Sequence, residues 1–99
     1  YYMTYKLYLD DLRPSPSSEW VVARSSNQAE VIIIKQGLPR FMSLDHDLGG
    51  DDTTMKFLKS MTELFPNGPV PEYYVHSANP VGKENIISYL ESWKRSLSM

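Results

Sequence analysis

The sequence has no cysteine among its 99 residues. This absence excludes a disulfide framework, a thiolate nucleophile and a zinc site with cysteine ligands. It fits a reducing compartment, and we expect a cytoplasmic protein. The sequence also lacks an apolar run long enough to cross a bilayer, and it lacks a basic segment followed by the apolar core of a signal peptide.

Strong net charge is also missing. The formal net charge of -2 is too small to predict bulk attraction to nucleic acid or to a membrane surface. No spaced aromatic and basic pattern of the kind that binds single strands stands out, and no duplex-binding surface is indicated. The patterns G-x-x-x-x-G-K, G-x-S-x-G and H-E-x-x-H are absent as well.

What the sequence does contain is typical of one compact domain. Its hydrophobic fraction of 41% suits a folded globule of this length. Tyr1 and Tyr2 precede Met3, and we expect Met3 to be the natural first residue. The predicted domain therefore spans residues 3–99.

Short apolar runs alternate with longer segments of helical spacing. The runs rich in β-branched and aromatic residues predict strands at 5–10, 20–24, 40–45 and 72–77. Capping residues and periodic apolar positions predict helices at 25–37, 53–65 and 79–97. The first helix contains the run Val31 to Ile34, which is also typical of a strand. The capping pair Ser25 and Gln28 and the stop at Gly37 favour the helix.

Strands that alternate with helices predict a parallel sheet with right-handed crossovers. Six aromatic side chains are expected in the core, namely Tyr8, Trp20, Phe41, Phe57, Phe65 and Trp93. The second helix is expected to bury a stripe that includes Leu64, and the last helix one that ends at Leu97. Asn79 and Pro80 have the character of an N-cap and the first helical residue.

The six aspartates fall in three doublets. Two of the doublets follow predicted strands, where ligands bind in parallel sheets. Carboxylates from neighbouring strand ends suit Mg²⁺ or Mn²⁺. We predict Asp10, Asp11 and Asp45 as metal ligands, with Asp47 as a substitute. The alternative is that these aspartates cap loops and helix starts, which is the interpretation we favour for Asp51 and Asp52 at the second helix.

Other polar residues follow the same strand ends. His76 and His46 are candidates for a general acid or base, because imidazole titrates near neutrality. The alternatives are a buried structural histidine at position 76 and a carboxylate-paired one at position 46. Two further groups are candidates for binding phosphate oxygens: the guanidinium groups of Arg13 and Arg24, and the start of the last helix at Ser77 and Asn79. Arg13 is alternatively a solvated loop residue.

Four segments together resemble a known family. "LYLDDLRPSP", "VVARS", "SLDHDLGG" and "VHSANPVG" are similar to the cyclic-phosphate-processing receiver-like family of bacteria and phages. The resemblance covers Leu7 to about Trp93. It implies a small three-layer receiver-like (flavodoxin-like) α/β fold with a four-stranded parallel sheet in the order 2-1-3-4. It also implies a role in processing cyclic phosphates of nucleotides or RNA ends.

The match to signalling receivers is incomplete. Asp10 and Asp11 correspond to the receiver's acidic pair, Asp45 to its phosphoacceptor and Ser77 to its hydroxyl residue. The fifth strand and the lysine of receivers have no match, and Lys83 is a poor substitute. The missing strand and lysine therefore argue against signalling through an aspartyl phosphate.

The leading hypothesis is a metal-dependent phosphoesterase acting on a cyclic phosphate. In this hypothesis Asp45 is part of the catalytic group together with His76 and His46. The alternative is a non-catalytic receiver-like module that binds metal and phosphate or a partner protein. A third hypothesis, a true phosphoacceptor receiver, is disfavoured by the missing lysine.

Overall fold

Four short parallel strands form one sheet. They are β1 (Lys6–Leu9), β2 (Trp20–Ala23), β3 (Phe41–Leu44) and β4 (Glu72–Val75). The computed structural model describes residues 5–98 and arranges the strands in the order β2-β1-β3-β4. The predicted parallel sheet and its order are confirmed. The expected start at Met3 lies outside the described residues.

Three helices follow β2, β3 and β4. They are α1 (Ser26–Gln36), α2 (Thr54–Leu64) and α3 (Pro80–Leu97). The predicted helix at the isoleucine run is confirmed, because the Ser25 side chain accepts the backbone N–H of Gln28 and Gly37 ends α1 with a positive φ of 81°. The predicted N-cap of α3 is confirmed, since the Asn79 side chain accepts the N–H of Gly82.

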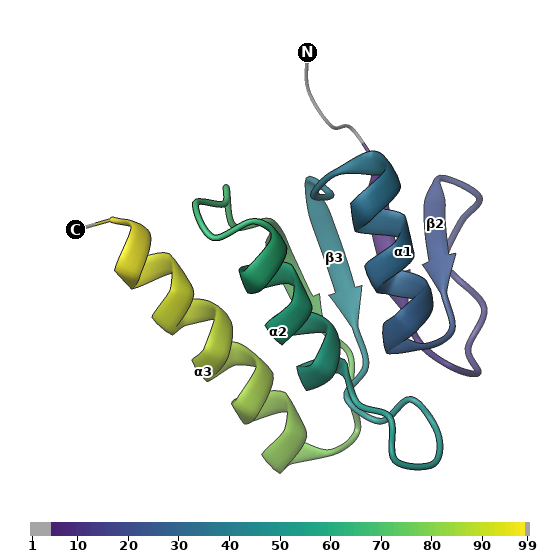
Figure 1. The fold of residues 1–99 in the computed structure, drawn as a ribbon. Coiled ribbons are helices and arrows are strands. Elements are labelled where there is room, and N and C mark those ends of the chain that lie inside the picture. The colour runs from purple at the N-terminus through teal and green to yellow at the C-terminus, as the bar shows by residue number, and fades with distance from the viewer. Residues whose placement is uncertain (1–4, 99) are drawn as a thin grey trace.

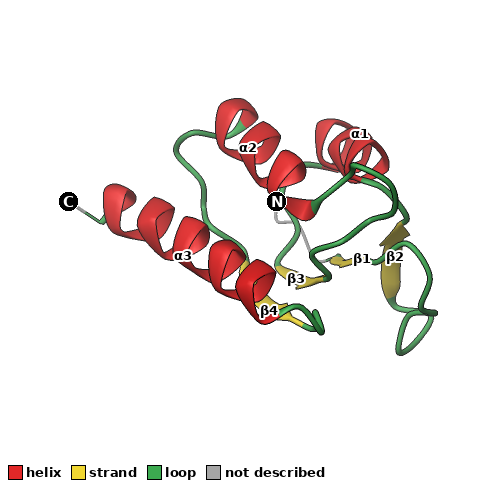
Figure 2. Cartoon of the chain, turned by 90° about the horizontal axis from the view of Figure 1, so that it is seen from below, coloured by secondary structure: helices red, strands yellow, loops and turns green. Residues whose placement is uncertain are grey.

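All three helices lie on the same face of the sheet (Figures 1 and 2). The described chain therefore forms two layers, where a third layer was expected. Right-handed crossovers explain this arrangement, because the steps from β2 to β3 and from β3 to β4 advance across the sheet in the same direction. The step from β1 to β2 runs in the other direction but is a loop rich in proline and serine, so no helix covers the second face.

The hydrophobic core lies between the sheet and the helices. The buried side chains include Leu7 and Leu9 from β1, Met42 and Leu44 from β3, and the helical residues Ile33, Phe57, Met61, Ile86, Leu90 and Trp93. The expected stripes are wrong at two positions near helix ends. Leu64 is 45% exposed and Leu97 is 38% exposed, and each is the last residue of its helix.

Two aromatic predictions also need correction. Tyr8, Phe57 and Trp93 are buried, but Trp20 and Phe41 are only partly buried and do not belong to the core cluster. Their backbone register turns both side chains to the helix-free face of the sheet. Phe65 is partly buried and packs against the core.

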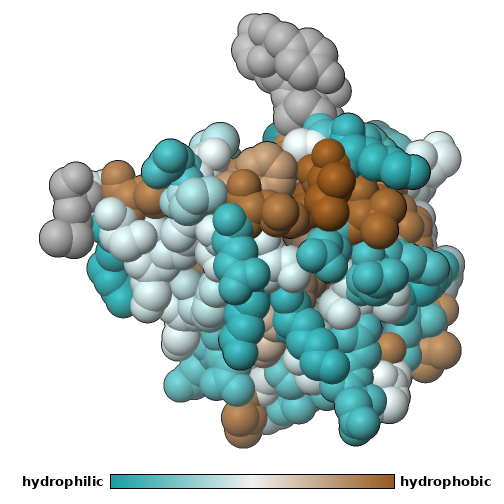
Figure 3. Space-filling view, in the orientation of Figure 1, coloured by the Kyte–Doolittle hydropathy of each residue, from teal (hydrophilic) through white to brown (hydrophobic). Residues whose placement is uncertain are grey.

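The helical side of the molecule is mainly hydrophilic (Figure 3). Apolar colour gathers over α1, where Val31 is 41% exposed and Ile34 is 59% exposed. Among the described residues, no helix combines the length and the apolar character needed to cross a membrane.

Candidate functional site at the carboxyl ends of the strands

The site lies where the chain changes direction in the sheet. It leaves β1 toward β2 and later returns on the other side of β1 as β3. Leu9, Leu44 and Val75 are paired in register, so the residues that follow them reach the edge of the sheet at one level. These residues are Asp10, Asp45 and His76. Ligands in open parallel sheets bind at such a switch point.

One ligand atom from each of these three residues lies within 4.8 Å of the other two. The cluster combines two carboxylates with an imidazole and has the composition and spacing to hold a metal ion. Asp10 and Asp45 were predicted as metal ligands, whereas His76 was predicted as an acid or base. The geometry therefore brings together side chains separated widely in the sequence.

Asp10 is the most buried member, with 1% of its surface exposed. Its Oδ1 accepts the backbone N–H groups of Leu12 and Arg13, each at 2.9 Å, and its Oδ2 lies 2.9 Å from His76 Nε2. Burial raises the pKa of Asp10, but the bonds from Arg13, Leu12 and His76 outweigh it and lower the pKa below its usual value. The carboxylate is therefore ionised at neutral pH.

The imidazole of His76 is held from three sides. Besides Asp10, it contacts Ser43, with 2.8 Å between Oγ and Nδ1. Its ring stacks on Tyr8, with centroids 4.9 Å apart and planes inclined by 2°. Sequence reasoning missed Ser43. The available signal was one polar residue in the otherwise apolar strand "FMSL", which indicates a buried polar contact.

Tyr8 is sensitive to the same environment. Burial raises the pKa of its hydroxyl, and the nearby negative charge of Asp10 raises it further. The phenol is therefore neutral at neutral pH, and its stacked ring forms one wall beside His76.

Asp45 is anchored by its main chain. Its N–H donates to Leu9 O at 2.9 Å, and its carbonyl accepts the hydroxyl of Thr54. The side-chain Oδ1 accepts the N–H of His46 at 2.8 Å. Within residues 5–98, no donor hydrogen-bonds to Asp45 Oδ2, so this oxygen is available to a ligand.

Two arginines brace the loop that follows β1. Arg13 Nη1 donates to the carbonyl of His76 at 3.1 Å. Arg24 Nη1 donates to the carbonyls of Asp10 and Arg13, at 3.0 Å and 2.6 Å. Each guanidinium has five N–H donors. In the described part of the chain both groups form these bonds through Nη1, which leaves other N–H donors for the oxygens of a phosphate.

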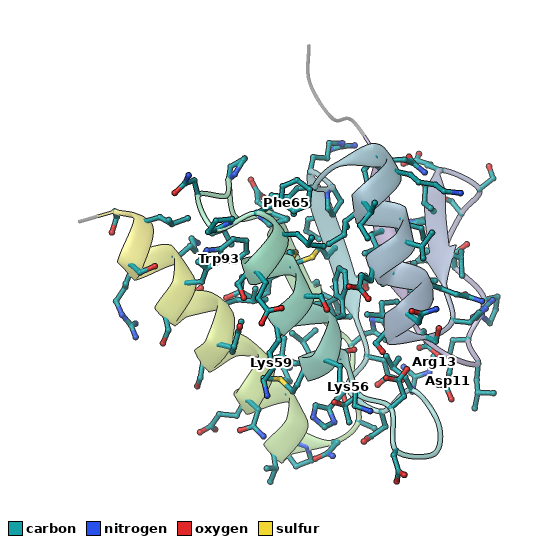
Figure 4. The ribbon with its side chains drawn as sticks, in the orientation of Figure 1. Asp11, Arg13, Lys56, Lys59, Phe65 and Trp93 are labelled. Atoms are coloured by element: carbon teal, nitrogen blue, oxygen red, sulfur yellow. The ribbon has the colours of Figure 1, made fainter. Side chains whose placement is uncertain are left out.

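Asp11 lies at the same edge as Arg13, near the start of α1 (Figure 4). Its Oδ2 lies against the loop after β3, 3.3 Å from the position that a Cβ would occupy on Gly49. Asp11 is not part of the three-residue cluster. Its predicted role as a metal ligand therefore stays a prediction.

His46 and Asp47 form a second polar group at the start of α3. The Nδ1 of His46 lies 3.1 Å from Asp47 Oδ1, and Asn79 Nδ2 donates to Asp47 Oδ2 at 3.4 Å. The hydrogen bonds from His46 and Asn79 lower the pKa of Asp47. A carboxylate of the chain itself thus lies beside the helix start where a phosphate was expected.

The ring of His46 also packs directly on α3. A Cβ added to Gly82 would lie 2.4 Å from the His46 ring, so only glycine leaves room for the imidazole. Ser77 Oγ accepts the N–H of Asn79 at 3.1 Å, which leaves the hydroxyl proton of Ser77 free to donate.

The third acidic doublet has a different role from the one predicted. The carboxylate of Asp52 accepts the N–H of Ser26 at 2.8 Å and the hydroxyl of the same residue. Asp52 therefore caps the first turn of α1, and the expectation that it caps α2 is wrong. The N-cap of α2 is Thr53, without a side-chain cap bond, and Asp51 is exposed in the loop.

Comparison with protein families decides the relationship that the geometry suggests. The family model described as "Cyclic-phosphate processing Receiver domain" matches residues 5–92, which include every strand and most of α3. The chain belongs to this family. No curated protein and no solved structure matches the chain significantly.

As a cyclic-phosphate processing receiver domain, the chain combines an acidic switch point with features that depart from a signalling receiver. His76 is hydrogen-bonded to Asp10, and a second histidine, His46, packs on Gly82. The described sheet has four strands. These features place an imidazole beside two carboxylates at the carboxyl-end edge of the sheet.

Proposed function

We propose that this domain is a metal-dependent phosphoesterase that opens cyclic phosphates of nucleotides or RNA ends. The observation that carries the proposal is the convergence of Asp10, Asp45 and His76 at the switch point, within 4.8 Å of one another. The family match supports a cyclic phosphate as the group that is processed.

The donor set fits Mg²⁺ or Mn²⁺, because both ions favour carboxylate oxygens and retain water. Asp10 is kept ionised by its hydrogen bonds, and Asp45 Oδ2 is available. When bound there, such an ion would supply charge that polarises the phosphoryl group and lowers the pKa of a water molecule.

The chain supplies binding and proton transfer. Arg13 and Arg24 present guanidinium donors beside the cluster, and Ser77 retains a hydroxyl proton. Guanidinium groups bind phosphate oxygens strongly through paired N–H donors. These contacts would orient the cyclic phosphate with its phosphorus atom facing the carboxylates.

His76 would carry the proton. Ser43 holds Nδ1, so the exchangeable position toward the cluster is Nε2, which contacts Asp10. A leaving oxygen that enters the cluster would compete with Asp10 for this N–H. In the net reaction a water oxygen bonds to phosphorus, one ester P–O bond breaks, and the freed ribose oxygen receives a proton.

The test is turnover of 2′,3′-cyclic nucleotides and of RNA ends that carry a cyclic phosphate, with Mg²⁺ or Mn²⁺ present. We expect the wild-type chain to form the monoester, and Asp45→Asn and His76→Gln to lose most activity. Asp51→Asn is the matched control, because this exposed aspartate lies in the same loop outside the cluster.

Absence of product with every substrate and both metals would overturn the proposal. Binding of the cyclic phosphate in titration calorimetry without product would identify the non-catalytic alternative instead. Equal turnover by Asp45→Asn and the wild-type chain would separate any hydrolysis from this cluster.

A further inference from the structure

The helix-free face of the sheet carries a row of side chains that ends near the candidate site. Tyr8, Ser43 and Tyr74 are paired in register across β1, β3 and β4. The neighbouring residue Tyr73 faces the helices, because its hydroxyl donates to Glu91 on α3. Since side chains alternate along a strand, Tyr74 faces the opposite side.

Aromatic rings from three strands are in contact on this face. Trp20 lies 5.9 Å from Tyr8 and 5.8 Å from Phe41, measured between ring centroids. Tyr8 in turn stacks on His76. None of these rings belongs to the core between the sheet and the helices. The aromatic face is therefore continuous with the imidazole of the candidate site.

Tyr74 is the accessible member of this face, with 60% of its surface exposed. It precedes His76 by two residues, a step of about 6.6 Å along a strand. The in-register residue on β3 between Tyr8 and Tyr74 is Ser43, and its hydroxyl contacts the imidazole of His76. The ring of Tyr74 thus lies about the length of a nucleoside from a phosphate held at His76.

The chemistry of the face fits a nucleobase better than a protein partner. Lys6 lies over the Trp20 ring at 5.0 Å and pairs with Glu19, while Ser43 is polar. Charged residues are depleted at the core of protein interfaces. Aromatic rings with polar neighbours instead suit a flat heterocycle, which gains stacking energy on either face.

We propose that Tyr74 and the adjoining helix-free sheet surface form a subsite for the nucleobase next to the cyclic phosphate. This inference rests on the proposed function and adds to it a reason to prefer base-bearing substrates over cyclic phosphates of a sugar alone. Tyr74 supplies the stacking ring, and the cluster at His76 receives the phosphate.

The experiment compares two ligands by titration calorimetry in EDTA, where binding is measured without turnover. The ligands are adenosine 2′,3′-cyclic phosphate and the base-free methyl riboside 2′,3′-cyclic phosphate. We expect Tyr74→Ala to weaken binding of the adenosine ligand about 10- to 100-fold. Binding of the base-free ligand should stay unchanged.

Tyr74→Phe keeps the ring and should bind like the wild-type chain. Val81→Ala is a second control, because Val81 is 69% exposed on α3. Circular dichroism checks that each variant is folded. Unchanged adenosine binding in Tyr74→Ala would overturn the subsite, as would an equal loss for both ligands.

Sedimentation analysis tests whether the surface at Tyr74 binds a second copy of the chain instead of a nucleobase. A dimer that Tyr74→Ala dissociates would overturn the subsite in favour of self-association. A failure of the proposed subsite can be distinguished from a failure of the proposed function. Tyr74-dependent binding without turnover would reject hydrolysis alone, whereas turnover that is insensitive to Tyr74→Ala would reject the subsite alone.

Discussion

Asp10 Oδ2 lies 2.9 Å from His76 Nε2, although the two residues are 66 positions apart in the sequence. This contact joins the end of β1 to the end of β4 across β3. It fixes the imidazole beside the two carboxylates, and the Ser43 hydroxyl holds the other side of the ring. The proposed chemistry of the domain depends on this arrangement.

The lowered pKa of Asp10 predicts how stability varies with pH. Because the folded-state pKa lies below the ordinary value of 3.8, the ionised carboxylate stabilises the fold above that pH, and this stabilisation is lost as the pH falls through the folded-state value. Asp10→Asn should lower the free energy of unfolding at pH 7 by on the order of 1–3 kcal/mol. Urea unfolding should show a smaller difference near pH 3. A difference that does not change with pH would contradict the assignment.

The packing of His46 on Gly82 predicts that a methyl group at position 82 would clash with the imidazole and that removing the imidazole would relieve the clash. Gly82→Ala should destabilise the fold by about 1–3 kcal/mol, because the new methyl group would overlap the His46 ring. Adding His46→Ala should recover part of this loss, since the ring that clashes is then removed. Thermal unfolding of the two single variants and the double variant measures the coupling. Strictly additive losses would show that the clash lies elsewhere.

Asp52 is predicted to stabilise α1 although it precedes α2 in the sequence. Asp52→Ala removes the acceptor for the N–H of Ser26 and should cost about 1 kcal/mol. Asp51→Ala, which changes an exposed neighbour, should have little effect on the free energy of unfolding. Equal losses in the two variants, measured by urea titration, would argue against a capping role.

The sequence was sufficient to predict the sheet and the edge of the sheet at which Asp10, Asp45 and His76 lie together. Strand and helix signals are local, and parallel strands necessarily bring their carboxyl ends to one edge, so Asp10 and Asp45 were expected to meet. Partners across the sheet are not local. The contact of Ser43 with His76 depends on the register of β3 and β4, which a linear pattern does not specify.

The aromatic face was missed for a similar reason. Its rings come one at a time from different strands, so no segment of the sequence contains an aromatic and basic pattern. Trp20 and Phe41 were assigned to the core because both residues are hydrophobic. The sequence does not show which side of the sheet lacks helices, and both rings lie on that side. The role of Asp52 was missed because its neighbour in sequence is α2 while its partner in space is α1.

A signalling receiver would accept a phosphoryl group on Asp45. The lysine expected in receivers has no match in the sequence, so an aspartyl phosphate would lack its usual counter-charge. We predict that incubation with acetyl phosphate and Mg²⁺ leaves the intact mass of the protein unchanged. A mass increase of one phosphoryl group that Asp45→Asn abolishes would reinstate the signalling interpretation.

The most direct test of the central claim is the rate of cyclic-phosphate opening as Mn²⁺ is titrated into the metal-free protein. The account predicts a rate that rises and saturates with Mn²⁺ for the wild-type chain, with the same midpoint for Asp51→Asn. For Asp45→Asn the rise should be abolished or shifted at least about tenfold to higher Mn²⁺, because one of two carboxylates is lost. A rate that is independent of the metal, or an unchanged midpoint in Asp45→Asn, would contradict it.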